Sequence, residues 1–260
     1  MLDRLRERET APELMDDRAA GGPELREALR HLRRLNRLFG ASGPTLYGME
    51  RLWREAGKPA RWTLLDVGAG SGDVNRRLLR WARRRGVELR IVLLDETAEA
   101  CEEARRYFAR EPSVEVRRGD LFALPAGTAD VVTATQVLHH FDGGDTARAI
   151  EAMLRAARVG VVVNDIHRHW IAWLAVWLAT RLISRNRYIR HDGPLSVAKG
   201  FRGAEWQALG ALPTGAEWQL RYAWRPLFRY AVTIRRSESR DESIGSIGES
   251  RQVDERRGSA

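Results

Sequence analysis

Three glycines at alternate positions, directly after an apolar run, constrain the fold of this chain more than any other feature. The apolar residues 62–67 predict a buried strand, and Gly68, Gly70 and Gly72 follow it before a helical pattern begins. A turn this tight needs residues without a Cβ wherever φ is positive. It also lets a ligand lie directly against the backbone, as nucleotide-type cofactors do over the end of a parallel strand. The turn therefore predicts a cofactor site.

Strand and helix patterns alternate after this point. Expected strands cover residues 62–67, 88–95, 114–118, 130–134 and 159–164, with helices at 74–85, 99–110 and 145–157. This alternation predicts an α/β fold with a doubly wound, Rossmann-like, mostly parallel sheet. A short helix at 202–209 and two strands at 217–224 and 227–235 predict a C-terminal antiparallel hairpin.

We expect three parts along the chain. Residues 1–60, with helices at 23–39 and 45–56, form an N-terminal helical extension that acts as a lid. Residues 61–236 form the sheet domain. Residues 237–260 are rich in Ser, Glu, Arg and Gly without an apolar period, so they predict a disordered tail.

Composition narrows the possible partners and compartment. The single cysteine, Cys101, excludes an internal disulfide and a cysteine-cluster metal site, and we expect no metal. The net charge of +9 comes almost entirely from arginines dispersed among acids, so a nucleic-acid partner is disfavoured. The first residues are charged and lack an apolar core, so we expect no secretory signal. We expect a cytoplasmic protein that can associate with membranes.

Three acids follow or end the expected strands. Asp66 lies two residues before the first glycine, where a carboxylate would attract a cationic amino-acid group rather than a phosphate. Asp95 ends the second strand, where a carboxylate can accept both hydroxyls of a ribose. Asp120 follows the third strand, where it can accept from an adenine amino group.

Together these residues resemble the Rossmann-like (class I) S-adenosylmethionine-dependent methyltransferases, over about residues 62–235. The resemblance implies S-adenosylmethionine as cofactor, with the glycine turn under its methionine part and Asp66 holding the ammonium through the turn or water. Asp95 would take the ribose hydroxyls, and Asp120 and Leu121 would contact adenine. The full set of implied cofactor-binding residues is Asp66, Gly68, Ala69, Gly70, Gly72, Asp95, Glu96, Asp120, Leu121 and Gln136.

The segment after the fourth strand carries paired histidines, His139 and His140, within a Val-Leu-His-His-Phe run. This run resembles small-molecule methyltransferases of quinone and polyketide biosynthesis. The resemblance implies a small, apolar, phenolic or polyketide-like acceptor, with O-methylation favoured over C-methylation. One histidine could act as a base, and we favour His140. Alternatively, one histidine caps the next helix and the other packs under the sheet.

Two more candidates belong to the same edge of the sheet. Asp165 ends the fifth strand beside Asn164, where it could reach the acceptor or simply cap a helix. His191 lies in an expected irregular segment, 186–201, and could be a base oriented by Asp192 or Asp165. The alternative for that segment is a purely structural loop.

A tryptophan-rich helix is expected at 169–185. Its uninterrupted apolar stretch, 170–179, is too short to span a bilayer. Trp170, Trp173 and Trp177 share one face. The helix could cover the sheet, wall an apolar acceptor pocket, or lie on a membrane surface with arginines on headgroups.

Other functions remain open on the sequence alone. The chain lacks the Asn/Asp-Pro-Pro-aromatic run and the Pro-Cys nucleophile that nucleic-acid methyltransferases use. Protein methylation is not excluded. A non-catalytic S-adenosylmethionine-binding or membrane-associated scaffold protein is an alternative from another class, and a nicotinamide dehydrogenase is a third.

Overall fold

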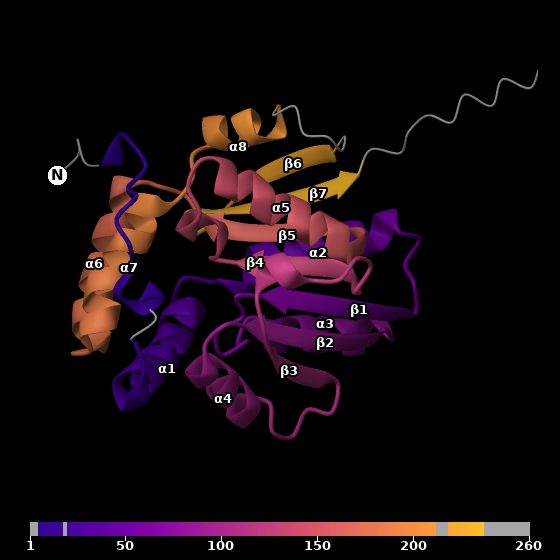
Figure 1. The fold of residues 1–260 in the computed structure, drawn as a ribbon, viewed down its shortest axis with the longest axis horizontal. Coiled ribbons are helices and arrows are strands. Elements are labelled where there is room, and N and C mark those ends of the chain that lie inside the picture. Colours follow the sequence, from indigo (N-terminus) through magenta and orange to yellow (C-terminus); the bar gives the residue numbers. More distant parts are fainter. Residues whose placement is uncertain (1–4, 18–19, 212–217, 237–260) are drawn as a thin grey trace, which may run out of the picture.

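A single seven-stranded sheet forms the centre of the molecule (Figure 1). The computed structural model describes residues 5–17, 20–211 and 218–236. The expected tail, 237–260, lies outside these residues. The strands are β1 (Arg61–Val67), β2 (Glu88–Asp95), β3 (Val114–Arg118), β4 (Ala129–Thr135), β5 (Ala157–Ile166), β6 (Trp218–Arg225) and β7 (Arg229–Arg236).

The strand order is β3-β2-β1-β4-β5-β7-β6. Strands β1 to β5 pair in parallel, and β7 runs antiparallel to both β5 and β6. The predicted fold class, with its C-terminal antiparallel hairpin, is confirmed. The order reverses between β1 and β4, and in open α/β sheets this is where ligands bind, outside the carboxyl ends of the strands.

Helices cover both faces of the sheet. One face is covered by α2 (Ser42–Glu55), α3 (Asn75–Arg85) and α4 (Ala98–Tyr107), and the other by α5 (Gly144–Ala156) and α8 (Gly203–Gly210). The central strands β1, β4 and β5 are largely apolar on both sides because both sides are buried, whereas the edge strands β3 and β6 carry exposed polar residues. The α2 helix packs so closely that a Cβ on Gly48 would lie 2.4 Å from Cγ1 of Val162 on β5.

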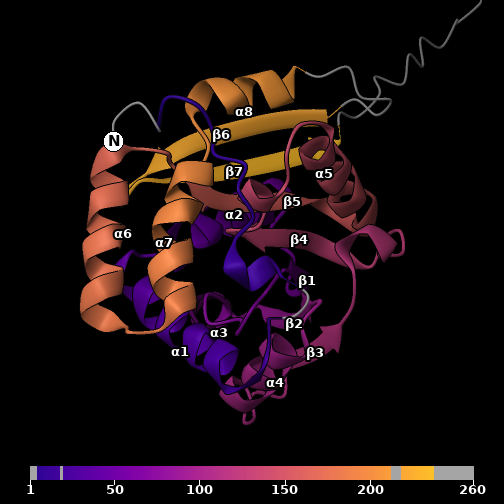
Figure 2. The same ribbon diagram turned by 60° about the vertical axis from the view of Figure 1, so that its left-hand side comes forward.

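Three helices lie beyond the carboxyl ends of the parallel strands (Figure 2). They are α1 (Gly22–Leu38), α6 (Trp170–Ile183) and α7 (Arg187–Lys199), and they share a small apolar cluster of their own. The 3-10 turn η2 (Leu14–Asp16) packs against α7. These three helices therefore lie over the edge of the sheet at which a ligand would bind.

The segment expected to be irregular, 186–201, is mostly helix α7. The prediction was wrong because Gly193 and Pro194, a pair that usually marks a turn, lie inside this helix. Instead, Gly193 is a contact point between helices, since a Cβ there would lie 2.7 Å from Cγ2 of Thr180 on α6.

The tryptophan-rich helix α6 does not cover the sheet. It packs chiefly against α7 and also touches α1, at the outer side of the molecule. Its outer face exposes Trp170, Ile171, Leu174, Leu178 and Leu182. Among the described residues, no helix has the length and apolar character needed to cross a bilayer.

Candidate functional site

The glycine turn after β1 has the backbone that the sequence predicts. Gly68, Gly70 and Gly72 all have positive φ, at 58°, 57° and 69°. A Cβ on Gly68 would lie 2.7 Å from Val137, and one on Gly72 would lie 2.4 Å from Leu93. At Gly70, by contrast, nothing lies within 4 Å of that position. The turn is closed on two sides and open at its tip, where a ligand can contact the backbone.

Asp66 holds the turn from below. Its two carboxylate oxygens accept hydrogen bonds of 2.6 Å, one from Thr133 Oγ1 and one from Asn75 Nδ2. Complete burial raises the pKa of Asp66 to about 6, even though these two hydrogen bonds favour the carboxylate. Asp66 thus ties β1 to β4 and to the start of α3, which fixes the shape of the turn.

The acids of β2 and β3 lie along the same edge. Asp95 Oδ2 accepts from the backbone N–H of Gly70 at 2.8 Å, and Oδ1 accepts from the backbone N–H of Thr97 at 3.0 Å. Asp120 caps the short helix η3 (Leu121–Ala123), with Oδ1 accepting from Phe122 N–H at 2.8 Å. The structure therefore brings Asp95 to the glycine turn. Glu96 is exposed.

Gln136, at the end of β4, has an unusual backbone. Its φ is 58°, a left-handed conformation that side chains other than glycine rarely adopt. Its side chain donates to Asn36 Oδ1 at 2.9 Å and accepts from Arg229 Nη2 at 3.3 Å. Asn36 in turn donates to Asp73 at 3.2 Å. These contacts join α1, the glycine turn, β4 and β7 around one point.

Arg229 is a buried cation with one unused donor group. Its side chain donates through Nε to Phe39 O and through Nη2 to Gln136, but Nη1 has no partner among the described residues. Burial lowers the pKa of Arg229 to about 10, although the nearby Asp165 and Asp73 favour the charged form. A buried, unsatisfied guanidinium nitrogen is costly to maintain. Its position suits an anionic group of a ligand.

A buried ionic network lies at the ends of β4 and β5. Asp165 accepts from His139 Nδ1 at 2.7 Å, and Glu13 of the N-terminal segment lies 3.5 Å from His139 Nε2. Burial disfavours the imidazolium, but these two carboxylates outweigh it and raise the pKa of His139 to about 9. The pKa of Glu13 falls to about 2, because His139, His140 and Lys199 outweigh the effect of burial.

This network resembles a metal site in composition, since ligand atoms of Glu13, His139 and His140 all lie within 4.8 Å of one another. However, the ammonium of Lys199 lies 3.7 Å from Glu13. With the His139 imidazolium, it already neutralises the carboxylate, so the cluster needs no metal ion for charge balance.

The two predicted bases end up in different surroundings. His140 Nδ1 is 2.9 Å from Asp16 Oδ2, whereas Nε2 has no hydrogen-bond partner among the described residues. His191 Nδ1 is 2.8 Å from Asp192 Oδ1, on the half-exposed side of α7. Asp165 therefore pairs with His139, and the structure does not bring it to His191.

Sequence reasoning missed several residues of this edge. Glu13, Asp16, Asn36, Lys199 and Arg229 come from segments far from the glycine turn, with no local motif. Lys199 offered a weak signal, as one of two lysines in an arginine-rich chain.

Comparisons with known proteins agree with this geometry. Residues 64–160, which contain the glycine turn, Asp95, Asp120 and the paired histidines, match the family described as "Methyltransferase domain". Over these residues the chain is therefore similar to methyltransferase domains. A search of the curated proteins found no match.

Solved structures similar to this chain include three informative examples. A SAM-dependent methyltransferase from Aquifex aeolicus aligns with a TM-score of 0.51 at 16% identity, over 80% of this chain and 97% of that one. Human N-acetylserotonin methyltransferase, solved in complex with SAM, aligns with a TM-score of 0.53 at 17% identity, over 91% and 65%. The citrinin polyketide synthase CMeT domain aligns with a TM-score of 0.50 at 16% identity, over 70% and 48%.

The chain thus spans about half the length of that polyketide synthase structure. At these identities the likeness concerns the fold, and it agrees with the Rossmann-like methyltransferase fold described above.

Proposed function

We propose that this protein transfers a methyl group from S-adenosylmethionine to a small, apolar acceptor of phenolic or polyketide-like type, with O-methylation favoured. The observation that carries the proposal is the open glycine turn at the β1–β4 reversal, with Asp95 hydrogen-bonded to its tip, inside a matched methyltransferase domain. A methyltransferase domain requires both a methyl donor and an acceptor.

The residues at this edge fit such a donor. The space at Gly70 admits a ligand against the backbone, and the unused Nη1 of Arg229 offers a cation for a carboxylate. Asp95 would hold ribose hydroxyls, and Asp120, with Oδ1 already used by Phe122, keeps Oδ2 for an amino group of adenine. Leu121 is buried beside it and would supply apolar contact.

The donor supplies a methyl group on a sulfonium, already activated for displacement. The protein's part is to align the acceptor and to take its proton. His140 suits the second task better than His139. Both ring nitrogens of His139 face carboxylates, so its protons are held, whereas His140 is oriented through Nδ1 by Asp16 and keeps Nε2 for an acceptor.

The N-terminal segment completes this part of the site. Arg8 donates to the backbone oxygens of Leu138, His139 and Phe141, and Asp192 accepts from the backbone of Leu14 and Met15. These contacts place Asp16 beside His140. The segment therefore acts as a lid that delivers a carboxylate to the base.

The outer face of α6 supports a peripheral contact with membranes, where lipophilic acceptors are found. Its five exposed apolar side chains form one stripe, and the exposed Arg181 and Arg185 lie at the end of the helix. An apolar helix face flanked by arginines is typical of helices that lie in the plane of an anionic membrane surface. We infer a cytoplasmic protein that visits such surfaces.

The decisive experiment measures S-adenosylhomocysteine formation with a panel of lipophilic phenols. We expect turnover in the native protein and a loss of about 100-fold or more in kcat for His140→Gln. His191→Gln is the matched control, because His191 has the same carboxylate pairing but lies on the half-exposed side of α7. Equal losses in both variants would contradict the assignment of His140.

The rival reading is a protein that binds S-adenosylmethionine without catalysis. Calorimetric binding of the donor, with no product from any acceptor and no change in His140→Gln, would favour that reading over the enzyme.

A further inference from the structure

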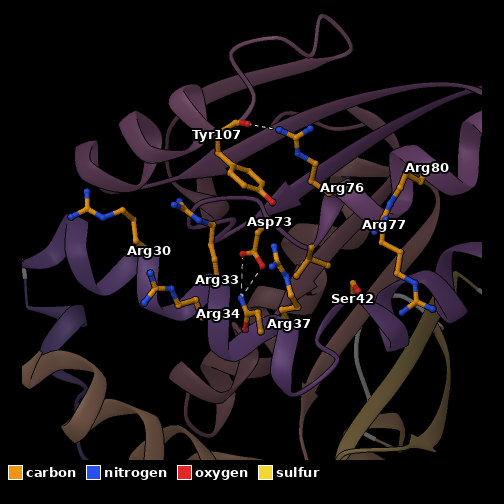
Figure 3. A pocket seen from close by; sticks show the side chains of 12 residues that line it. Arg30, Arg33, Arg34, Arg37, Ser42, Asp73, Arg76, Arg77, Arg80 and Tyr107 are labelled. Atoms are coloured by element: carbon orange, nitrogen blue, oxygen red, sulfur yellow. Dashed lines mark hydrogen bonds between the residues drawn. The ribbon is translucent and has the colours of Figure 1, made fainter. Parts of the chain in front are cut away.

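A cavity of about 360 Å³ lies between α1 and α3, beside the site described above. Seven of its twelve lining residues are arginines. Figure 3 shows their side chains arranged around one hollow: Arg30, Arg33, Arg34, Arg37, Arg76, Arg77 and Arg80. This volume lies within the range of small-molecule sites, but such sites are ordinarily lined by apolar side chains. The lining therefore indicates an anionic ligand.

The helical spacing produces this concentration of charge. The four arginines of α1 follow the i, i+3, i+4, i+7 pattern of one helix face, and those of α3 lie within its first two turns. The two faces meet across the cavity, so positive charge lines it from both sides.

Two of the arginines are held in position before any ligand binds. The ring of Tyr107 lies between them, with the Arg33 guanidinium 5.0 Å and the Arg76 guanidinium 4.7 Å from its centroid. Arg76 also donates to the backbone oxygen of Tyr107 at 2.6 Å, and Arg33 pairs with Glu103 at 3.3 Å. These contacts reduce the ordering cost of binding an anion.

The cavity has more positive charge than the protein neutralises. Among the described residues, the guanidinium groups of four lining arginines make no hydrogen bond or ion pair: Arg34, Arg37, Arg77 and Arg80. Asp73 is the one acid among the lining residues. Its carboxylate is already used by Asn36 and Ser71, and burial raises its pKa. Arginines gathered in this way repel one another unless an anion lies between them.

We propose that this cavity is a second ligand site, which binds a multiply charged phosphate group such as a phosphate or diphosphate ester. Guanidinium groups bind phosphate oxygens in pairs, and a phosphate group can accept from two opposed helices at once. A single carboxylate would leave most of the seven arginines unneutralised.

The cavity adjoins the proposed donor site: it shares Asn36 and Asp73 with the hydrogen-bond network around Gln136, but none of the residues proposed to bind the donor. Asp73 directly follows the glycine turn, and Asn36 connects Asp73 to Gln136. A phosphate-bearing ligand bound here would therefore lie next to the methyl donor. The proposal does not depend on methyl transfer. The cavity and its arginine lining are present in the protein regardless of the reaction that it catalyses.

The test uses inorganic pyrophosphate as the probe, in isothermal titration calorimetry at fixed ionic strength. The test variant is the double substitution Arg37→Gln with Arg77→Gln, one from each helix. The control is Arg84→Gln with Arg221→Gln, which removes the same charge from two exposed arginines outside the cavity. Donor binding by each variant reports whether the neighbouring site is intact.

We expect the cavity variant to bind pyrophosphate at least about tenfold more weakly, since it loses charge-assisted hydrogen bonds, and the control to change by less than about twofold. Equal weakening in both variants would mean a general charge effect and would overturn the proposal. So would the absence of pyrophosphate binding at millimolar concentration, or binding of single-stranded RNA that both variants weaken equally.

A second arm identifies the source of the phosphate. Vesicles containing phosphatidic acid, compared with phosphatidylcholine vesicles, are titrated with and without pyrophosphate. Binding that pyrophosphate displaces and the cavity variant loses assigns the site to a lipid headgroup. Pyrophosphate binding without vesicle binding assigns it to a free phosphate ester.

Discussion

The backbone N–H of Gly70 donates a 2.8 Å hydrogen bond to Oδ2 of Asp95. This bond joins the end of β1 to the end of β2, and the backbone N–H of Thr97 holds the other oxygen. The carboxylate is therefore oriented by two backbone donors at the open tip of the glycine turn. A charged group fixed in this way can bind hydroxyls without first being ordered.

The first prediction concerns this carboxylate. Asp95→Asn keeps the shape of the side chain but removes its charge and one acceptor oxygen. We expect the dissociation constant for S-adenosylmethionine to rise about tenfold or more, because hydrogen bonds to a charged group contribute about 1.5–3 kcal/mol. Calorimetry measures this, and Asp145→Asn on the exposed start of α5 is the control. An unchanged affinity would remove Asp95 from the donor site.

The three turn glycines should respond differently to alanine. Gly72→Ala combines a positive φ with a clash against Leu93, so we expect the free energy of unfolding to fall by roughly 2–5 kcal/mol. Gly70→Ala has only the positive φ, so we expect a fall of about 1–2 kcal/mol. Urea denaturation compares the variants.

Gly86 supplies the matched control for Gly70. It has a φ of 66° and open space around its Cβ position, but it ends α3 away from the proposed site. We expect Gly86→Ala and Gly70→Ala to cost similar stability, whereas only Gly70→Ala weakens donor binding. If both variants bind the donor equally well, the turn is not where the donor lies.

Stability should depend on pH through His139. Its folded pKa of about 9 lies above the unfolded value of 6.5. The stabilisation is therefore complete below pH 6.5 and is lost as the pH rises through 9. The difference corresponds to about 3 kcal/mol. Urea denaturation between pH 6 and 10 measures it, and His139→Gln should show a much flatter profile. A native profile as flat as that of the variant would show that His139 is not held as an imidazolium.

Arg229→Lys tests the unused guanidinium nitrogen. The substitution keeps a positive charge but loses the planar, two-nitrogen donor geometry. We expect KM for donor or acceptor to rise about tenfold. The melting temperature should fall as well, because lysine also loses the bonds from Nε to Phe39 and from Nη2 to Gln136. Arg221→Lys, on the exposed part of β6, is the control. A large loss of stability with unchanged KM would make Arg229 a structural residue instead.

The local pattern of the sequence was sufficient to predict the parallel strands of the sheet and the glycine turn. The strands at 88–95 and 114–118 begin and end where the sequence places them, and the three turn glycines have the predicted positive φ. These features depend on neighbouring residues: apolar side chains in a run along β2 and at alternate positions along β3, and turn positions where a Cβ is costly. The family resemblance followed from the same stretch and is confirmed by the match over residues 64–160. The individual roles of the site residues stay predictions.

Long-range packing decided the rest. Glu13, far from His139 in the sequence, lies 3.5 Å from its Nε2, and Arg229 of the last strand donates to Gln136. Neither pairing leaves a trace in local spacing, because both partners are brought together only when the N-terminal segment and the antiparallel hairpin dock on the sheet. Gly193 also shows that local pattern is not enough. It suggested a turn, but its small size instead allows α7 to pack closely against Thr180 of α6.

The sequence alone determined the strand–turn–helix unit and the kind of cofactor turn it forms, because these follow from backbone sterics and burial over a few residues. Only the tertiary structure determined which carboxylate pairs with which histidine, that α6 presents an apolar face outward, and that two arginine-rich helix faces meet across one cavity. Such features depend on the relative placement of distant elements, which the packing of the whole chain sets.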